Sequence, residues 1–349
     1  MGANSSIEWT DATWNPTRGC SRVSPGCGGA ADVGGCYAER QAYRFSGPGM
    51  PYEGLVRLGK QGPRWTGDVR LVPEKLVEPL RWTNPRRVFV NSMSDLFHET
   101  LSNKEIASIF GVMAACPHHT FQVLTKRASR MREWFDWLDA ENPTAEGKIM
   151  RCFGAACERL RDEDGLFRGA AGRMVTRRVA RAWPLPNVWI GVSAEDQQRA
   201  EERVPELLRV PAAVRFVSFE PALGPINFAP WIGAVEDEGD GHCVRCRVGH
   251  ELYEEYQCPP GFGPFLNWVI VGGESGPGAR PFDVAWARSV VTQCRAAGVA
   301  CFVKQLGANP YAYQLGDVSR LPQLVARKGG DWSEWPEDLR VREFPEVQP

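Results

Sequence analysis

Six short runs of β-forming apolar residues recur along this 349-residue chain, with helical stretches between them. Several runs are continuously apolar instead of alternating, which is typical of strands covered on both faces in a parallel sheet. Strands that alternate with helices predict α/β architecture with right-handed crossovers. Six or seven such units favour a closed or partial (β/α) barrel. The runs lie at residues 88–90, 121–124, 188–192, 214–219, 268–271 and 301–303.

Helix start signals occupy the stretches between these runs. Ser102 and Glu105 have the spacing of a capping box before a set of apolar residues. Asp283 is suited to cap a helix that buries one apolar face. Ser193 is suited to cap the charged helix that runs to Leu208. These signals predict helices between successive strands, as the α/β pattern requires.

Two stretches are too long for ordinary crossovers. Residues 138–186 form a charged insertion rich in Ala and Arg, and residues 232–264 form a second insertion with acidic residues, Gly and Pro. No internal repeat stands out elsewhere. The sequence therefore predicts a single α/β barrel domain over residues 1–349 that carries two insertions.

Three cysteines lie in a Gly-rich segment near the N-terminus. Six residues separate Cys20 from Cys27, and eight separate Cys27 from Cys36. The chain has 11 cysteines but shows no signal peptide and no apolar run that could span a bilayer, so metal binding in a reducing cytoplasm is expected rather than disulfides. Three thiolates with no fourth ligand nearby suit a metal centre with one open position. Both a [4Fe–4S] cluster and a zinc ion fit that description.

A second group of metal-ligating residue types falls inside the second insertion. Cys243 and Cys246 have the two-residue separation that is common in zinc chelation. Together with His250 and Cys258 they form a Cys3His set, which predicts a small structural zinc knuckle. Unligated thiols are the other interpretation.

Polar residues follow almost every expected strand. The active sites of α/β barrels lie at the C-terminal strand ends, so these side chains are candidates for binding a cofactor or substrate. Two adjacent glycines in the set could present backbone N–H groups to a cofactor, or they could form a tight turn. The set comprises Asn91, Ser92, Asp95, Lys126, Ser193, Glu195, Glu220, Gly272, Gly273, Glu274, Ser275 and Lys304.

Several segments together resemble a known family. The N-terminal IEWTDATWNPTRGCSRVSPGC and CYAER, and later VFVNSMSDLFHE, FQVLTKR, NVWIGVSAED, RFVSFEPALGPI, WVIVGGESGPGARP and FVKQLG, resemble a phage-associated three-cysteine-motif family. That family is distantly similar to radical SAM enzymes such as spore photoproduct lyase. The resemblance covers roughly residues 7–136 and 183–307.

The resemblance implies a radical SAM type of (β/α) barrel with the cysteine loop after the first strand. It implies that Cys20, Cys27 and Cys36 hold a [4Fe–4S] cluster whose open iron binds S-adenosylmethionine. The spacing of six and eight differs from the familiar C-x3-C-x2-C and from the six and two more usual in the family, so residues 30–35 form an insertion in the loop.

The resemblance also assigns roles to strand-end residues. Asn91, Ser92 and Asp95 would bind the methionyl amino group, and Lys126 and Glu220 would act on the substrate. Of the other members of the strand-end set, Ser193, Glu195 and residues 272–275 are further candidates for cofactor binding, whereas Lys304 could equally be a structural ion-pair partner.

The expected reaction is hydrogen abstraction by a 5′-deoxyadenosyl radical from a nucleobase, nucleotide or modified DNA base. One variant is isomerisation of a hypermodified thymidine in phage DNA, within the host cytoplasm and with an external electron donor. The net charge of −1 means that contact with DNA would need a local basic patch. A zinc-stabilised nucleic-acid-binding or partner protein without redox chemistry is the alternative. A hydrolytic barrel that uses Asp95, Glu220 and Glu274 with a divalent metal is a third hypothesis.

Overall fold

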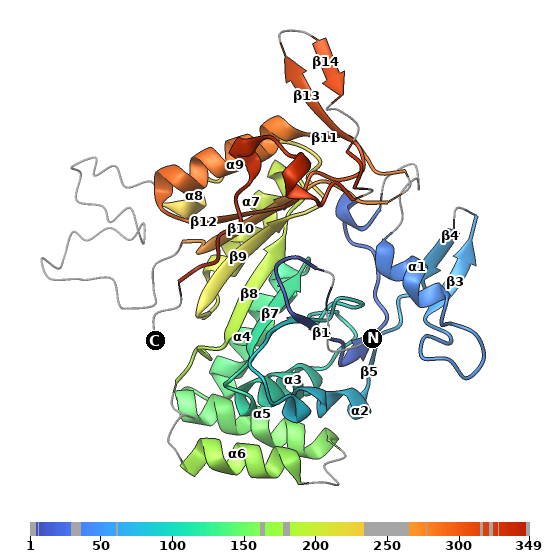
Figure 1. Ribbon diagram of the computed structural model, residues 1–349. Coiled ribbons are helices and arrows are strands. Elements are labelled where there is room, and N and C mark those ends of the chain that lie inside the picture. Colours follow the sequence, from blue (N-terminus) through green and yellow to red (C-terminus); the bar gives the residue numbers. More distant parts are fainter. Residues whose placement is uncertain are drawn as a thin grey trace, which may run out of the picture. The chain divides into compact units, whose positions relative to one another are not determined.

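A computed structural model shows a mixed α/β protein whose chain divides into two compact units (Figure 1). Unit 1 comprises residues 1–192 and 210–213, and unit 2 comprises residues 193–209 and 214–349. The expectation of a single barrel domain stays a prediction. The structure describes residues 5, 7–28, 36–60, 62–160, 165–176, 182–233, 265–276, 278–314, 317–320, 324–326 and 328–346.

Unit 1 is built on four parallel strands, β1 (Ala12–Trp14), β6 (Arg87–Val90), β7 (Thr120–Thr125) and β8 (Val188–Ser193). They pair in the order β1-β6-β7-β8, with Trp14 opposite Val90 and Val90 opposite Val123. Because these neighbouring strands are parallel, their C-terminal ends meet at one edge, as they do in a β/α barrel. That edge is where Asn91 and Lys126 leave the sheet.

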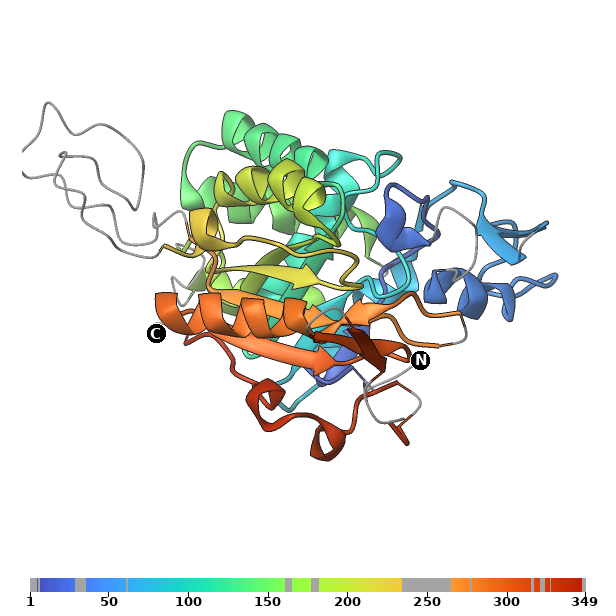
Figure 2. The ribbon, with the colours of Figure 1, turned by 90° about the horizontal axis from the view of Figure 1, so that it is seen from above.

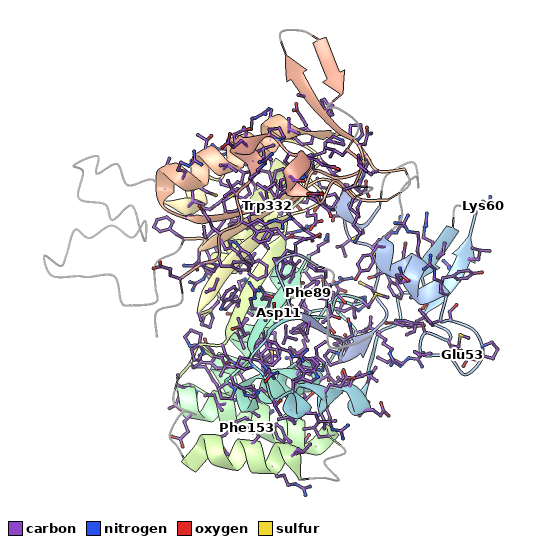
Figure 3. All side chains as sticks on the ribbon, viewed as in Figure 1. Asp11, Glu53, Lys60, Phe89, Phe153 and Trp332 are labelled. Carbon is purple, nitrogen blue, oxygen red and sulfur yellow. The ribbon has the colours of Figure 1, made fainter. Side chains whose placement is uncertain are left out.

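Two larger helices and the first insertion accompany these strands. Helix α3 (Asn103–Ala115) begins with the expected capping box between Ser102 and Glu105, and α4 (Ala128–Glu141) follows β7. The insertion forms α5 (Ala145–Arg159) and α6 (Leu166–Thr176), which contact α3 and each other (Figure 1). Phe153, labelled in Figure 3, is buried in this helical layer against Phe167. The insertion expected from residue 138 thus begins inside the last turn of α4.

Short elements surround the cysteine segment of unit 1. Strand β2 (Thr17–Arg18) pairs with β5 (Arg70–Leu71), and β3 (Val56–Gly59) pairs with β4 (Gly62–Trp65) in a hairpin whose tip carries Lys60 (Figure 3). Helix α1 (Tyr37–Tyr43) starts directly after Cys36. The unit also contains α2 (Pro73–Leu76) and the 3-10 turns Pro25–Cys27 and Glu78–Arg81.

Unit 2 repeats the alternation with three parallel strands, β9 (Val214–Phe219), β10 (Trp268–Gly272) and β12 (Ala300–Gln305), in that order. Helix α9 (Val284–Ala297) lies along β12 (Figure 2), and Asp283 caps it as expected. The unit also contains α7 (Gln197–Leu208), α8 (Ala229–Ile232), and a small sheet of β11 (Phe282–Asp283), β13 (Pro310–Gln314) and β14 (Asp317–Arg320). Two 3-10 turns, Trp332–Glu334 and Glu337–Leu339, follow.

All six expected strands are confirmed, and one helix cap is corrected. Ser193 is the last residue of β8 and does not cap the following helix. Asp196 caps α7 instead, because its side chain accepts a hydrogen bond from the Arg199 backbone N–H at 2.9 Å. No helix in the described part of the chain is long and apolar enough to cross a membrane.

Gly111 sets how closely α3 approaches the inserted helix α5. A Cβ at this position would lie 2.3 Å from the carbonyl oxygen of Cys152, which is far inside van der Waals contact. Gly111→Ala should therefore lower the free energy of unfolding by about 1–3 kcal/mol, as overpacking does. Urea unfolding followed by circular dichroism measures this loss.

Gly154 is the matched control, since it lies in α5 with nothing within 4 Å of its virtual Cβ. Gly154→Ala should stabilise the protein by roughly 0.5–1 kcal/mol because alanine is the better helix former. Equal effects of the two substitutions would contradict the close packing of α3 on α5.

Candidate metal centre

Cys20, Cys27 and Cys36 are free, partly buried thiols in unit 1. Cys20 follows β2, Cys27 ends a 3-10 turn, and Cys36 is the residue before α1. Cys20 and Cys36 pack against one apolar cluster that includes Trp65 and Met93. Burial, the charge of Asp95 and the charges of the other two cysteines raise the pKa of the Cys20 thiol to about 12.

The chemistry of these donors fits a thiolate-ligated metal. Three unbridged thiols offer the soft ligands that iron–sulfur clusters and zinc take. Among the described residues, no three Cys, His, Asp or Glu side chains are already gathered closely enough to hold a metal ion. The loop segment 29–35 between Cys27 and Cys36 lies outside the described residues. The candidate site therefore consists of the three cysteines and of the residues that bind the chain next to Cys20 and Cys36.

Asp95 is the most heavily bonded of the expected site residues. Its buried carboxylate accepts hydrogen bonds from Thr125 Oγ1 at 2.7 Å and from the backbone N–H groups of Phe97 and Lys126 at 3.0 and 3.2 Å. Arg127 Nη1 donates a fourth, at 3.1 Å. Asp95 therefore joins the loop after β6 to the end of β7, and its oxygens are committed to protein donors.

Arg127 links this carboxylate to the cysteine segment. Its side chain is 3% exposed, and its Nη2 donates to the Ser21 carbonyl oxygen at 3.1 Å and to Ser21 Oγ at 2.8 Å. Its Nη1 lies 3.9 Å from Cys20 Sγ, and its Nε donates to Glu99 at 2.9 Å. The guanidinium fork therefore fixes the position of Cys20 against the sheet edge.

Sequence reasoning missed Arg127 and selected its neighbour Lys126. Lys126 is partly buried, and its backbone N–H donates to Asp95 Oδ2. Both residues follow the same strand, and a single sequence does not show which of two adjacent basic side chains turns toward the cysteines.

Ser21 also contacts a buried histidine. His98 shares a hydrogen bond with Ser21 Oγ at 2.9 Å and another with Thr100 Oγ1 at 3.0 Å. Burial and then the charge of Arg127 lower the pKa of His98, so the ring is neutral near pH 7. The neutral ring therefore does not repel the Arg127 guanidinium.

The loop after β6 is bound to both ends of the cysteine segment. Ser94 Oγ donates to the Gly19 carbonyl oxygen at 2.6 Å, directly before Cys20. Tyr37 Oη donates to the Ser92 carbonyl oxygen at 2.7 Å, directly after Cys36. Ser92 Oγ lies 3.2 Å from the side chain of Asn15. The expected site residue Ser92 therefore does lie next to the cysteine segment.

Asn91 has two unusual properties. It is the one non-glycine residue of the described chain with a positive φ, 61°, and it is 3% exposed. Its Oδ1 accepts from the Thr17 backbone N–H at 3.4 Å, whereas its buried Nδ2 has no hydrogen-bond partner. A buried donor without an acceptor costs about 1–3 kcal/mol, and this donor lies at the C-terminal sheet edge, where the sequence predicts a cofactor contact.

The expected acidic residues of unit 2 have protein partners. Glu195 is fully buried and pairs with Arg203 at 3.0 Å. Glu274 pairs with Arg280 at 2.7 Å and also accepts from the Arg280 backbone N–H. Each carboxylate is therefore held by an arginine close to it in sequence.

Glu220 and Lys304 form a partly exposed pair at the strand ends of unit 2. Lys304 Nζ lies 2.6 Å from Glu220 Oε1, and Gln305 Nε2 lies 3.3 Å from the same oxygen. The side chains of Glu220 and Lys304 are 18% and 15% exposed. This pair brings together charges that can bind a polar ligand.

The adjacent glycines of unit 2 serve the turn after β10. The Gly273 backbone N–H donates to the Gln305 carbonyl oxygen at 3.0 Å, and a Cβ on Gly273 would lie 2.5 Å from the Leu306 carbonyl oxygen. The Gly272 carbonyl oxygen accepts from the Ala222 backbone N–H. These contacts favour the tight-turn interpretation. Ser275 lies in the same loop and is partly buried, and Ser193, at the end of β8, is buried.

The expected zinc knuckle lies outside the described residues, which exclude 234–264. This applies to Cys243, Cys246, His250 and Cys258, so the knuckle stays a prediction.

Comparison with known proteins identifies the family. The family model described as "Protein of unknown function (DUF5131)" matches residues 4–335. The chain belongs to this family. A search of curated proteins and a search of solved structures found no match. The three cysteines and the residues that bind their segment all lie within the DUF5131 match.

Removing the Arg127 side chain should disturb the whole sheet edge. Arg127→Met leaves the buried Asp95 carboxylate without its charged partner, which typically costs about 3–5 kcal/mol of unfolding free energy. Arg127→Lys should lower the free energy of unfolding by less, because lysine keeps the positive charge but lacks the several N–H donors of the guanidinium. Chemical denaturation measures both.

Arg132→Met, in the helix that directly follows Arg127, provides the control. The Arg132–Asp136 pair is an exposed i,i+4 contact at 2.8 Å, worth roughly 0.3–0.5 kcal/mol. A loss for Arg127→Met as small as that for Arg132→Met would contradict the linking role of Arg127.

Proposed function

We propose that this protein is a radical SAM-type iron–sulfur enzyme in which Cys20, Cys27 and Cys36 hold a [4Fe–4S] cluster. The observation that carries the proposal is a set of three free thiols whose segment is bound to the C-terminal edge of parallel strands through Ser94, Tyr37 and Arg127. Three cysteine ligands leave one iron open. With S-adenosylmethionine at that iron, one electron from an external donor would pass through the cluster and break the sulfonium C–S bond, which would leave methionine and supply a 5′-deoxyadenosyl radical able to remove a hydrogen atom from a substrate.

The residues of the chain would bind and orient these groups. Asn91 is our first candidate for a contact with S-adenosylmethionine, because its buried Nδ2 has no protein acceptor. Ser92 and Asp95 lie in the same loop, and Asp95 acts there by fixing Arg127. We assign Lys126 and Glu220 to the substrate, with Glu220 charge-balanced by Lys304. The buried cluster around Trp65 and Met93 keeps water from one side of the cysteines.

The proposed substrate is a nucleobase, nucleotide or modified DNA base, and isomerisation of a hypermodified thymidine is the most specific variant. The resemblance of the cysteine segment and strand ends to the phage-associated three-cysteine family supports this choice. An external one-electron donor would be needed. Free cysteines throughout the described residues suit a reducing cytoplasm.

Anaerobic purification followed by metal analysis and reaction with dithionite and S-adenosylmethionine tests the proposal. We expect about four irons per chain, as one [4Fe–4S] cluster requires, and formation of 5′-deoxyadenosine. Colourless zinc protein that leaves S-adenosylmethionine intact after cluster reconstitution would overturn the proposal in favour of a zinc-stabilised binding protein.

Single replacement of Cys20, Cys27 or Cys36 by alanine should abolish iron loading, because each would supply one cluster thiolate. Cys157→Ala is the control, since Cys157 is an exposed free thiol in α5. Iron and sulfide assays on the reconstituted variants measure the effect. Full iron content in all three loop variants would contradict the ligand assignment.

A further inference from the structure

A second arginine contacts the chain near all three cysteines. Arg22 lies two residues after Cys20, and its guanidinium forms a bidentate pair with Glu39, three residues after Cys36. The Nε atom lies 3.1 Å from Oε1 and the Nη2 atom 2.6 Å from Oε2. One ion pair thus joins the first and last parts of the cysteine segment.

This pair is buried at its acidic end. Glu39 is 1% exposed, and its Oε1 also accepts a hydrogen bond from the Trp65 backbone N–H at 3.2 Å. Arg64 Nη1 approaches Oε2 at 4.0 Å. A buried carboxylate with several donors has a defined position, and loss of its charge leaves those donors without a partner. Glu39 therefore anchors Arg22 to both α1 and β4.

Gly28 brings the chain next to the middle cysteine, Cys27, into contact with the Arg22 guanidinium. This residue follows Cys27 and has φ 144°, and a Cβ on it would lie 2.6 Å from Arg22 Nη1 and 2.8 Å from Arg22 Cζ. The backbone after Cys27 therefore passes directly against the guanidinium group. The positive φ favours glycine here, and a Cβ would require the Arg22 side chain to move.

We propose that the Arg22–Glu39 pair, with Gly28 packed against it, limits how far the three cysteine positions can separate before any metal binds. The Arg22 side chain thus connects positions two residues after Cys20, one after Cys27 and three after Cys36. The pair thereby reduces the conformational freedom that the three cysteines lose on metal binding. Arg22 and Glu39 are positioning residues. The inference rests on the proposed metal-binding role of the three cysteines, but it holds for iron or zinc.

The first test uses the metal-free protein and does not depend on metal binding. Dibromobimane becomes fluorescent when it joins two neighbouring thiols, and peptide mass spectrometry identifies the joined cysteines. The wild-type protein should give products that join members of the Cys20, Cys27 and Cys36 set. Glu39→Gln should lose most of these products, because the neutral amide no longer holds the guanidinium.

The second test measures Co²⁺ affinity by the thiolate charge-transfer absorption of the bound ion. Glu39→Gln should raise the Kd about 10–100-fold, the range found for residues that orient metal ligands. Arg22→Lys should give a smaller rise. Gly28→Ala, which keeps both charges but displaces the guanidinium, should reproduce the effect of Glu39→Gln.

Asp11→Asn is the matched control. Asp11 (labelled in Figure 3) forms a bidentate pair with Arg87 at 2.9 and 3.2 Å, in the same unit but on exposed side chains. It should leave both the bimane products and the Co²⁺ affinity unchanged. Glu39→Gln protein with wild-type bimane products and wild-type Kd would overturn the inference. Wild-type protein that binds neither Co²⁺ nor iron would instead overturn the metal site, while the bimane result still tests the pair.

Discussion

The arrangement of unit 1 depends on the buried pair between Asp95 and Arg127. Asp95 leaves the sheet after β6 and Arg127 after β7, and their contact at 3.1 Å joins the two loops. The remaining guanidinium donors reach Ser21 and Glu99. Since both charged groups are almost completely buried, each needs the other, and separation of the loops would leave an unpaired charge in the interior. Because Arg127 also binds Ser21, the same buried pair keeps the cysteine segment at the sheet edge.

Arg22 and Arg127 hold the cysteine segment in different ways. Arg127 joins Cys20 and Ser21 to the parallel strands, whereas Arg22 joins the parts of the segment to one another through Glu39. Arg127 Nη1 lies 3.9 Å from Cys20 Sγ, and its charge favours a thiolate there, whereas burial and Asp95 raise the pKa of the same thiol. An apolar cluster that includes Trp65 and Met93 packs against Cys20 and Cys36.

The strands could be predicted because their signal is local. Six apolar runs of three to six residues mark six parallel strands, and the caps at Ser102 and Asp283 depend on neighbouring residues alone. Strand β1 has only three residues and the accessory strands two to five, too few for a periodic pattern. The cap at Asp196 was missed because a polar strand end, Ser193, precedes it closely and carries the same type of signal.

The site residues could be predicted in part. The positions of Asn91, Ser92 and Asp95 beside the cysteine segment follow from parallel strands that end at one edge. Their roles do not follow, because ion-pair partners lie far apart in sequence: Asp95 is 32 residues from Arg127, and Arg22 is 17 residues from Glu39. Glu195 and Glu274 looked equally suitable for a ligand, yet each carboxylate is bound by an arginine.

We propose that the three-cysteine segment holds a redox-active cluster that binds S-adenosylmethionine, and electron paramagnetic resonance of the anaerobically reconstituted, dithionite-reduced protein is the first test to make. We predict the spectrum of a reduced [4Fe–4S] cluster, a clear change of that spectrum when S-adenosylmethionine is added, and loss of the signal in Cys20→Ala protein. A cluster spectrum that S-adenosylmethionine leaves unchanged, or a silent protein that contains only zinc, would contradict the account.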